Sequence, residues 1–228
     1  MANPLVFPGP GRRISADERR AQLIDTAMSL FARKGFTATT TREIARAAGV
    51  NEAIIFRFFP HKDDLYAAIL ERKSSEARTD ALVGELRAAA DAGDDERVIG
   101  SVVRRIVEHH RDDPQFLRLM LHSALEGHSF ARQYRERHFA PLHAFLLEYV
   151  TARQASGRFR AGDAEALVRV ILAVPVHHGL IETLLPEEDV VFTGDIVSIY
   201  TAVVLDGLRM PRHALPASSG HQPVPFTD

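Results

Sequence analysis

Residues 40–65 constrain the fold of this chain more than any other stretch, because they hold two helix starts with a glycine between them. Thr40 and Glu43 have the spacing of a capping box, in which each side chain accepts a hydrogen bond from the backbone N–H group of the other residue. Gly49 is typical of a sharp turn that ends a helix, and Asn51 can cap a second short helix. Two short helices joined in this way predict a helix-turn-helix unit, whose second helix enters the major groove of DNA.

A longer pattern of fixed spacings runs through the same region. It reads Thr-Thr-x-x-Ile-Ala-x-x-Ala-Gly-Val, then an aromatic-rich helix and Lys-x-x-Leu, and its residues are Thr40, Thr41, Ile44, Ala45, Ala48, Gly49, Val50, Phe56, Phe59, Lys62 and Leu65. With residues 23–36 as a matching first helix, the sequence resembles the TetR family of bacterial transcriptional regulators. The family usually has tyrosine at the position of Phe56, so a hydroxyl group that could donate to a phosphate is missing here.

Two helix starts are expected to hold the DNA backbone. Thr41 and Arg42 lie at the beginning of the first short helix, and Lys62 lies at the head of the helix that follows the unit. Helix N-termini and basic side chains bind phosphates, so these residues are predicted to contact the backbone on either side of the groove. Replacement of Lys62 by alanine would then lower the salt dependence of binding.

Base contacts are expected from the second short helix. Asn51 can pair with adenine, Glu52 can accept from cytosine, and Ile54 can lie against a thymine methyl group. For Asn51, a simple helix cap is an equally good interpretation. The predicted DNA-binding residues are Thr40, Thr41, Arg42, Asn51, Glu52, Ala53, Ile54, Phe56, Arg57 and Lys62.

Charge is distributed unevenly along the chain. Residues 12–62 carry ten basic and five acidic side chains, a net charge of +5, whereas the whole chain has a net charge of −2. A basic N-terminal part on an acidic remainder is typical of a phosphate-binding head on a body that avoids DNA. A solvated charged surface would give the same composition.

The pattern along the chain predicts an all-α protein, with an N-terminal three-helix helix-turn-helix DNA-binding domain and a larger helical ligand-binding and dimerisation domain. We expect a flexible arm at residues 1–14, the DNA-binding domain at 15–62, the ligand-binding and dimerisation domain at 63–210 and a flexible tail at 211–228. One helix is expected from about residue 63 to 90, loosened within residues 73–80, and Pro141 is expected to kink another.

The last two predicted helices, residues 164–185 and 194–210, have almost no polar face. Such helices are buried nearly all round, which a single chain can rarely achieve. Two from each of two chains would form a four-helix homodimer interface, as the family resemblance also implies. We expect Val203 and Val204 within it.

A small apolar effector is expected to bind the body. The predicted ligand-binding residues share aromatic, sulfur or imidazole side chains, and they are Phe116, Met120, Phe139, Phe145, Tyr149, His177 and His178. A pocket of this kind offers apolar walls and one or two oriented hydrogen bonds. Equally, the stripe could be plain core, and the histidine pair could be buried at the dimer interface.

Several kinds of site are not expected. The chain has no cysteine, and its eleven histidines include no HExxH spacing, while the adjacent pairs at 109–110 and 177–178 diverge on a helix. We therefore predict no metal site, no cofactor, no catalytic residues and no enzyme. No secretion signal or apolar segment of eighteen residues is expected, which favours a cytoplasmic protein without a membrane partner.

These observations favour a ligand-responsive regulator, a repressor released from a palindromic double-stranded DNA operator by the effector. One alternative is a helical small-molecule-binding protein or enzyme in which the helix-turn-helix is incidental packing. Another is a regulator or nucleoid-type protein that binds DNA without a ligand.

Overall fold

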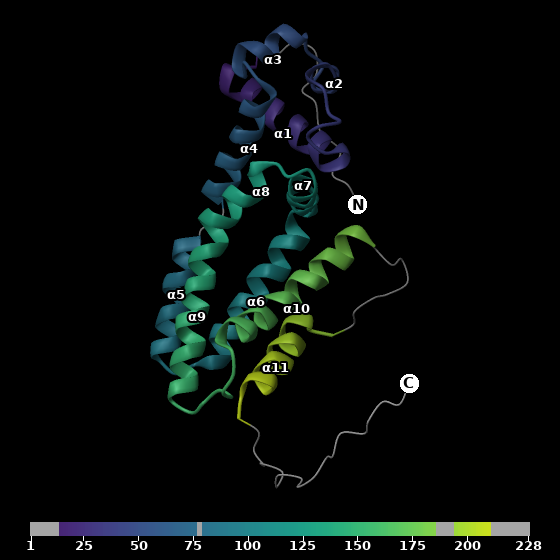
Figure 1. Ribbon diagram of the computed structural model, residues 1–228. Helices are drawn as coiled ribbons and strands as arrows, with labels where there is room; N and C mark the ends of the chain where they lie inside the picture. Colours follow the sequence, from purple (N-terminus) through teal and green to yellow (C-terminus); the bar gives the residue numbers. More distant parts are fainter. Residues whose placement is uncertain (1–13, 77–78, 186–193, 211–228) are drawn as a thin grey trace, which may run out of the picture.

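The computed structural model describes residues 14–76, 79–185 and 194–210, which form a helical head on an elongated helical body (Figure 1). The predicted tail and all of the predicted arm except Ile14 lie outside this part. Its elements are, in order, α1 (Ala16–Lys34), α2 (Thr41–Ala47), α3 (Glu52–Phe58), α4 (Lys62–Glu76), α5 (Thr79–Asp91), α6 (Asp95–Asp112), α7 (Pro114–Leu125), α8 (Ser129–Tyr134), the π-helical turn η1 (Arg135–Phe139), α9 (Ala140–Ala155), α10 (Ala164–Leu184) and α11 (Ile196–Leu208). Among the described residues there is no strand, only one isolated bridge between Phe159 and Arg209, and the predicted all-α class is confirmed.

Local capping signals fix the helices of the head, α1 to α3. Ser15 and Glu18 form a capping box at the start of α1, and Thr40 and Glu43 form one at the start of α2. α1 ends at Gly35, whose φ of 80° lies in the region that favours glycine. The signals that set both ends of α1 are thus adjacent to it in the sequence.

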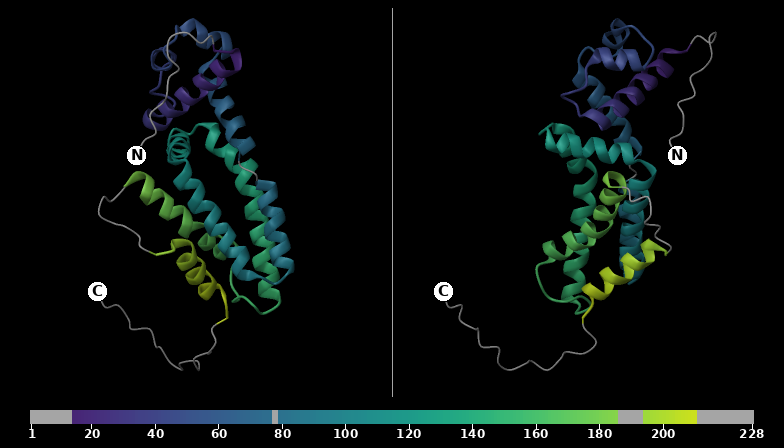
Figure 2. Two further views of the ribbon diagram at one scale, coloured as in Figure 1. Left: turned by 180° about the vertical axis from the view of Figure 1, so that it is seen from behind. Right: turned by 90° about the vertical axis from the view of Figure 1, so that its right-hand side faces the viewer.

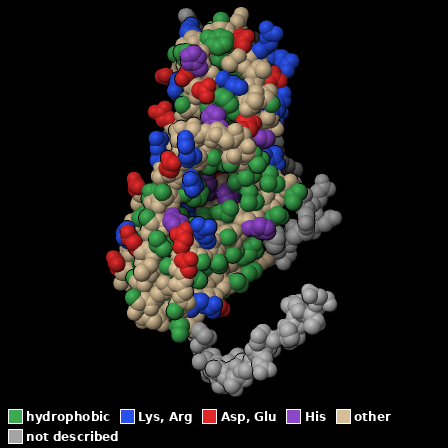
Figure 3. Space-filling model, viewed as in Figure 1, with side chains coloured by type: hydrophobic (Ala, Val, Ile, Leu, Met, Phe, Trp, Pro, Cys, Tyr) green, Lys and Arg blue, Asp and Glu red, His purple; other side chains and the backbone are tan. Residues whose placement is uncertain are grey.

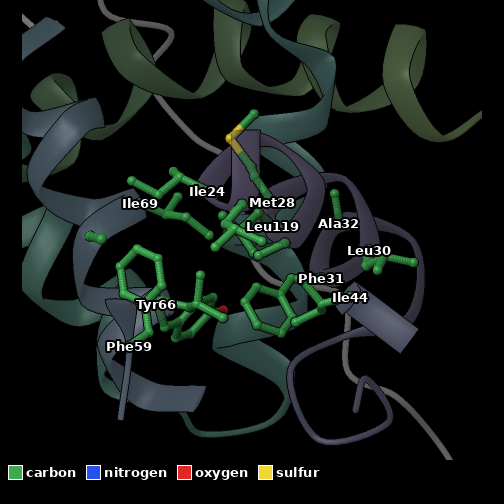
Figure 4. Close-up of a cluster of buried hydrophobic side chains, with 14 of the residues drawn as sticks. Ile24, Met28, Leu30, Phe31, Ala32, Ile44, Phe59, Tyr66, Ile69 and Leu119 are labelled. Carbon is green, nitrogen blue, oxygen red and sulfur yellow. The ribbon is translucent and has the colours of Figure 1, made fainter. Parts of the chain in front are cut away.

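One hydrophobic cluster joins the head to the body. Figure 4 shows Leu119 of α7 among Ile24 and Met28 of α1, with Tyr66 of α4 beside Phe31. The Phe31 and Tyr66 ring centroids are 5.1 Å apart in an edge-to-face arrangement. The division expected between residues 62 and 63 therefore runs through a continuous core.

The segment that leads from the head into the body forms two helices, instead of the single helix expected over residues 63–90. α4 ends at Glu76 and α5 begins at Thr79. Two neighbouring residues of α4 form ion pairs with different parts of the molecule. Arg72 pairs with Asp25 of the head at 2.7 Å. Lys73 pairs with Asp113, at the start of α7 in the body, also at 2.7 Å. α4 is thus tied to both parts of the molecule.

The body is organised around α6, which packs against α10 and α11, while α5 lies along α9 (Figure 2). Asp95 at the start of α6 is buried and accepts from Tyr149 Oη at 2.7 Å and from Arg153 Nε at 2.6 Å. Burial raises the pKa of the Tyr149 hydroxyl, and the Asp95 carboxylate raises it further. The disturbance expected at Pro141 takes the form of η1, which directly precedes α9 and in which Ala140 N–H donates to Arg135 O.

The sequence analysis expected no segment apolar enough to cross a membrane, but α10 is long and apolar enough by length and composition. Its mean hydropathy reaches 1.5 over eighteen residues, with 28% of that window buried. Length and composition alone are weak evidence for a span, because a core helix of a soluble protein has the same properties. Here α10 packs closely on α6: the His110 ring lies so near Gly179 that any side chain there would collide with it.

Stability should fall in mild acid because of His110, which is only 8% exposed. Burial, with His109 and His178 nearby, lowers the pKa of His110 from 6.5 to about 4. As the pH falls below 6.5, His110 becomes protonated in the unfolded chain, whereas in the folded chain it stays neutral down to about pH 4. The contribution of His110 to the free energy of unfolding is therefore complete above pH 6.5 and is lost as the pH falls from 6.5 to 4. The loss from this group should approach about 1.4 kcal/mol per pH unit.

Urea unfolding at a series of pH values would measure this effect. We expect His110→Leu to have a shallower decline than the wild type between pH 6.5 and pH 4. His177→Gln, at an exposed neighbouring position, should keep the wild-type slope. Parallel declines for the wild type and His110→Leu would mean that His110 is protonated in the folded protein.

Candidate nucleic-acid interface and effector groove

The α2–α3 unit is rigidly built. Gly49, with φ of 66°, makes the turn between the two helices, and Gln22 of α1 donates from Nε2 to Ala48 O at 3.2 Å. Ile55 and Phe59 are buried beneath α3. The outer side of α3 is consequently fixed relative to α1.

The outer side of α3 carries the predicted base-reading residues. Asn51, Ala53, Phe56 and Arg57 are exposed, and Ile54 is half-buried. Asn51 acts as the helix cap, since its Oδ1 accepts from Ala53 N–H at 2.9 Å. The side chain would have to give up this bond to read a base.

Two predicted DNA contacts are bonded to each other. Thr41 at the start of α2 donates its hydroxyl proton to Glu52 at the start of α3, at 2.6 Å. The Glu52 carboxylate thus links the first turns of both helices. This arrangement gives Glu52 a positioning role that sequence spacing did not indicate.

The start of α2 offers one free cation. The hydroxyl of Thr40 is engaged in its capping box, and Glu43 pairs with Lys34 at 2.6 Å, whose hydrogen bond lowers the pKa of Glu43 to about 2. Arg42 is exposed and forms no ion pair within the described ranges. It remains available for a phosphate.

The structure corrects the role assigned to Lys62. Its ammonium donates to Phe36 O at 2.8 Å and Thr39 O at 3.0 Å, and it lies 4.1 Å from the centre of the Phe36 ring. These bonds are made within the head, to residues more than twenty positions earlier. Lys62 therefore holds the turn between α1 and α2, so an effect of Lys62→Ala on DNA binding would no longer report a phosphate contact alone.

Arg19 of α1 lies beside α3, and the sequence analysis did not predict it as a DNA-binding residue. The start of α1 and α3 enclose a surface groove of about 790 Å³, bordered by Arg19 together with Asn51, Ile54 and Arg57. The Arg57 guanidinium lies 5.2 Å from the Phe58 ring centre. No local signal places Arg19 beside α3, because the contact depends on how the two helices cross.

The loop after α7 meets the head at the same turn. Glu126 accepts from the N–H groups of Phe36 and Thr37, both at 3.1 Å, and from the Thr37 hydroxyl at 3.3 Å. The ring centroid of His128 lies 4.5 Å from that of Phe36 and 4.3 Å from that of Tyr66. No local pattern indicates these contacts, since Glu126 lies ninety positions after Phe36.

The body contains a groove of about 990 Å³ between α7, α8 to α9, and α10. Figure 3 shows a hollow at this place, with hydrophobic side chains on one side and charged ones on the other. Met120, Leu121, Phe139 and Leu172 supply apolar walls, and the remaining lining includes the pair His143 and Glu165 at 3.1 Å. Such a mixture suits a mainly apolar molecule with a polar end.

Phe139 also borders a small inner cavity of about 60 Å³, lined on the other side by His109, His110 and His138. Burial lowers the pKa of all three histidines, so their rings are uncharged at neutral pH. Nε2 of His138 is buried without a hydrogen-bond partner. The small cavity therefore holds uncharged imidazole rings near the groove, with Phe139 bordering both.

The predicted ligand face is not one surface. Met120 and Phe139 border the groove, but Phe116 is buried in the core shared with the head, where its ring centroid lies 4.8 Å from that of Tyr134. Phe145 and Tyr149 belong to the second core cluster around α6. These three side chains pack against other helices and are corrected to core residues.

The histidine pair on α10 is split between two environments. His177 is exposed, whereas His178 is buried, with Nδ1 3.3 Å from Tyr200 Oη and Nε2 3.3 Å from Glu182. Neither borders the groove. His178 faces α11 within its own chain, so both earlier interpretations, a ligand contact and a buried pair at the dimer interface, are corrected for it.

Within residues 14–76, 79–185 and 194–210, no group of three or more His, Asp or Glu side chains is placed to hold a metal ion. The described residues offer an exposed basic surface on the head and a mainly apolar groove in the body.

Known proteins match this geometry. A family model described as bacterial regulatory proteins of the TetR family covers residues 23–69. YvkB, an HTH-type transcriptional regulator of Bacillus subtilis (strain 168), is 50% identical over 54 residues, which are 24% of this chain and 29% of YvkB. FasR, an HTH-type transcriptional activator of Mycolicibacterium smegmatis (strain ATCC 700084 / mc(2)155), is 33% identical over 111 residues, 48% of each chain. The chain thus spans less than half the length of both relatives.

The fold of the whole chain also has solved counterparts. A transcriptional regulator from Saccharomonospora viridis, in complex with choline, superimposes with a TM-score of 0.59 at 21% identity, covering 86% of this chain and 100% of that one. The family model falls on residues of α1 to α4, the region that contains the capped α2–α3 unit with its exposed face. Residues 23–69 of the chain thus match the TetR family of bacterial regulatory proteins.

Proposed function

We propose that this protein is a cytoplasmic, homodimeric repressor that binds a palindromic operator and leaves it when a small apolar molecule enters the groove. The observation that carries the proposal is the face of α3, which presents Ala53, Phe56 and Arg57 to solvent on a fixed scaffold. A short helix held in this way can enter a major groove. The surrounding charge of residues 12–62 favours the phosphates.

The dimer is supported by apolar side chains that the single chain leaves exposed. Val170 and Leu184 of α10 are 52% and 49% exposed, and Ile199 and Val203 of α11 are 49% and 62% exposed. Large exposed apolar side chains on two helices that pack together are typical of an interface. Val204 is only 3% exposed, so it belongs to the core of its own chain and is removed from the interface we expected.

The effector is supported by the size and lining of the groove. Cavities of about 300 to 1,000 Å³ with apolar walls hold small molecules, and the groove of about 990 Å³ lies at the upper end of that range. The related structure with choline shows that one protein of this fold was solved with a small molecule.

Selection of binding sites from a pool of randomised duplexes tests the function directly. We expect an inverted repeat whose half-sites are about one helical turn or more apart, because a two-fold dimer places its two α3 helices on one side of the duplex. Recovery of duplexes with no common motif would favour a sequence-independent DNA-binding protein. Absence of any retained duplex would count against DNA binding itself.

Glu52 should influence both affinity and base preference. Glu52→Gln keeps an oxygen that can accept from Thr41 but removes a charge that the phosphates repel, so non-specific binding should tighten. Selection should relax at one symmetric pair of positions, by about 1–3 kcal/mol if a base contact is lost. Thr41→Val is the matched control, because it removes the donor and leaves the carboxylate. The same selected motif for the wild type and Glu52→Gln would leave Glu52 with only its bond to Thr41.

The dimer should depend on Val203. Val203→Asp puts a carboxylate on a surface that is open in the monomer and buried in the proposed dimer, where an unpaired charge is costly. Light scattering should show a monomer at concentrations where the wild type is dimeric. Leu125→Asp introduces the same charge at a side chain that is 86% exposed on α7 and should stay dimeric. A dimeric Val203→Asp variant would place the interface elsewhere.

A further inference from the structure

The turn between α1 and α2, residues 35–40, has its backbone polar groups satisfied by two side chains of opposite charge. Its carbonyl groups at Phe36 and Thr39 accept from Lys62, and its N–H groups at Phe36 and Thr37 donate to Glu126. Hydrogen bonds to ionised groups are stronger than those between neutral groups. Lys62 follows α3 directly, but Glu126 comes from the body.

Glu126 adds directional hydrogen bonds to the contact between head and body, which otherwise consists mainly of apolar side chains. The shared core of α1, α4 and α7 holds the head against the body, but hydrophobic contacts are non-directional. The three hydrogen bonds to Glu126 specify one position of the turn. Gly35 leaves the space that the carboxylate occupies, because a side chain there would collide with Glu126 Oε1.

The loop that carries Glu126 is also a wall of the groove. Its neighbours Gly127, His128 and Ser129 border the groove directly, as does Ala124 at the end of α7. His128 in addition packs on Phe36 of the turn. A molecule in the groove therefore touches the segment that grips the head.

We propose that Glu126 is a positioning residue for DNA binding, and that occupancy of the groove changes DNA affinity through the bonds between Glu126 and the α1–α2 turn. This inference rests on the proposed function. The turn leads directly into Thr41 and Arg42 at the start of α2, so displacement of the turn moves the phosphate contacts and the attached α3. A ligand that binds better when the loop is shifted must, by linkage, weaken the DNA complex by the same factor.

Hydrogen exchange tests the contact without DNA. The Phe36 and Thr37 amides should exchange faster in Glu126→Ala than in the wild type, and Glu126→Gln, which retains an acceptor oxygen, should restore part of the protection. Glu136→Ala is the control, since Glu136 borders the groove without bonding to the turn. Unchanged protection in Glu126→Ala would overturn the proposal.

A double-mutant cycle tests whether occupancy of the groove affects DNA binding through Glu126. A tryptophan side chain introduced into the groove takes the place of the unidentified effector. Ala131 of α8 borders the groove, so Ala131→Trp partly fills it. We expect Ala131→Trp to weaken binding to the duplex recovered by selection by about five-fold or more, and to change it by less than about two-fold in the Glu126→Ala background. Equal effects in both backgrounds would overturn the coupling. Ala124→Trp fills the groove from α7 and replaces the first variant should that one unfold.

The two tests separate this inference from the proposed function. A wild-type protein that retains no duplex would overturn the proposed function and, with it, the coupling to DNA, while the exchange measurement would still decide whether Glu126 holds the turn. A wild-type protein that binds its duplex and gives an additive cycle would overturn only the role of Glu126 in coupling.

Discussion

The packing of α1 against α4 and α7 in one hydrophobic core is the interaction on which the rest of the molecule depends. The head alone has too few residues to bury a sufficient core, since domains of about 60 residues are already marginal. Leu119 and Phe116 of α7 complete it, beside Phe31 and Tyr66. Because the DNA-reading helix rests on side chains supplied by the body, a rearrangement of α7 cannot leave the head unaffected.

Local signals in the sequence predicted the elements of the head with accuracy, because a cap and the N–H groups it satisfies lie within three residues. Thr40, Glu43 and Asn51 are observed in the capping roles expected of them. Lys62 was misassigned because its partners, Phe36 and Thr39, are distant in sequence and become neighbours only in the fold. Position at a helix start indicates a possible phosphate contact, but it does not reveal a competing partner.

The sequence predicted the helices of the body well, but several of the residues predicted to bind the ligand proved to be core residues. Periodicity identifies an apolar face without identifying what covers it. The face with Phe116, Phe145 and Tyr149 is covered by neighbouring helices of the same chain, whereas Phe139 borders open space. α10 looks like a membrane span by composition for a related reason: part of its apolar surface packs on α6 and another part, including Val170 and Leu184, is exposed in the single chain.

The fit between Gly35 and Glu126 limits how freely the head and the body of this protein can be exchanged for those of another. A head with a larger residue at position 35 would displace the carboxylate, and a body with an apolar residue at position 126 would leave the Phe36 and Thr37 amides without their acceptor. Recombination that joins a foreign head to this body therefore preserves the junction only when both positions are inherited together. Positions 35 and 126 thus constrain each other although they lie far apart in the sequence, in different parts of the molecule.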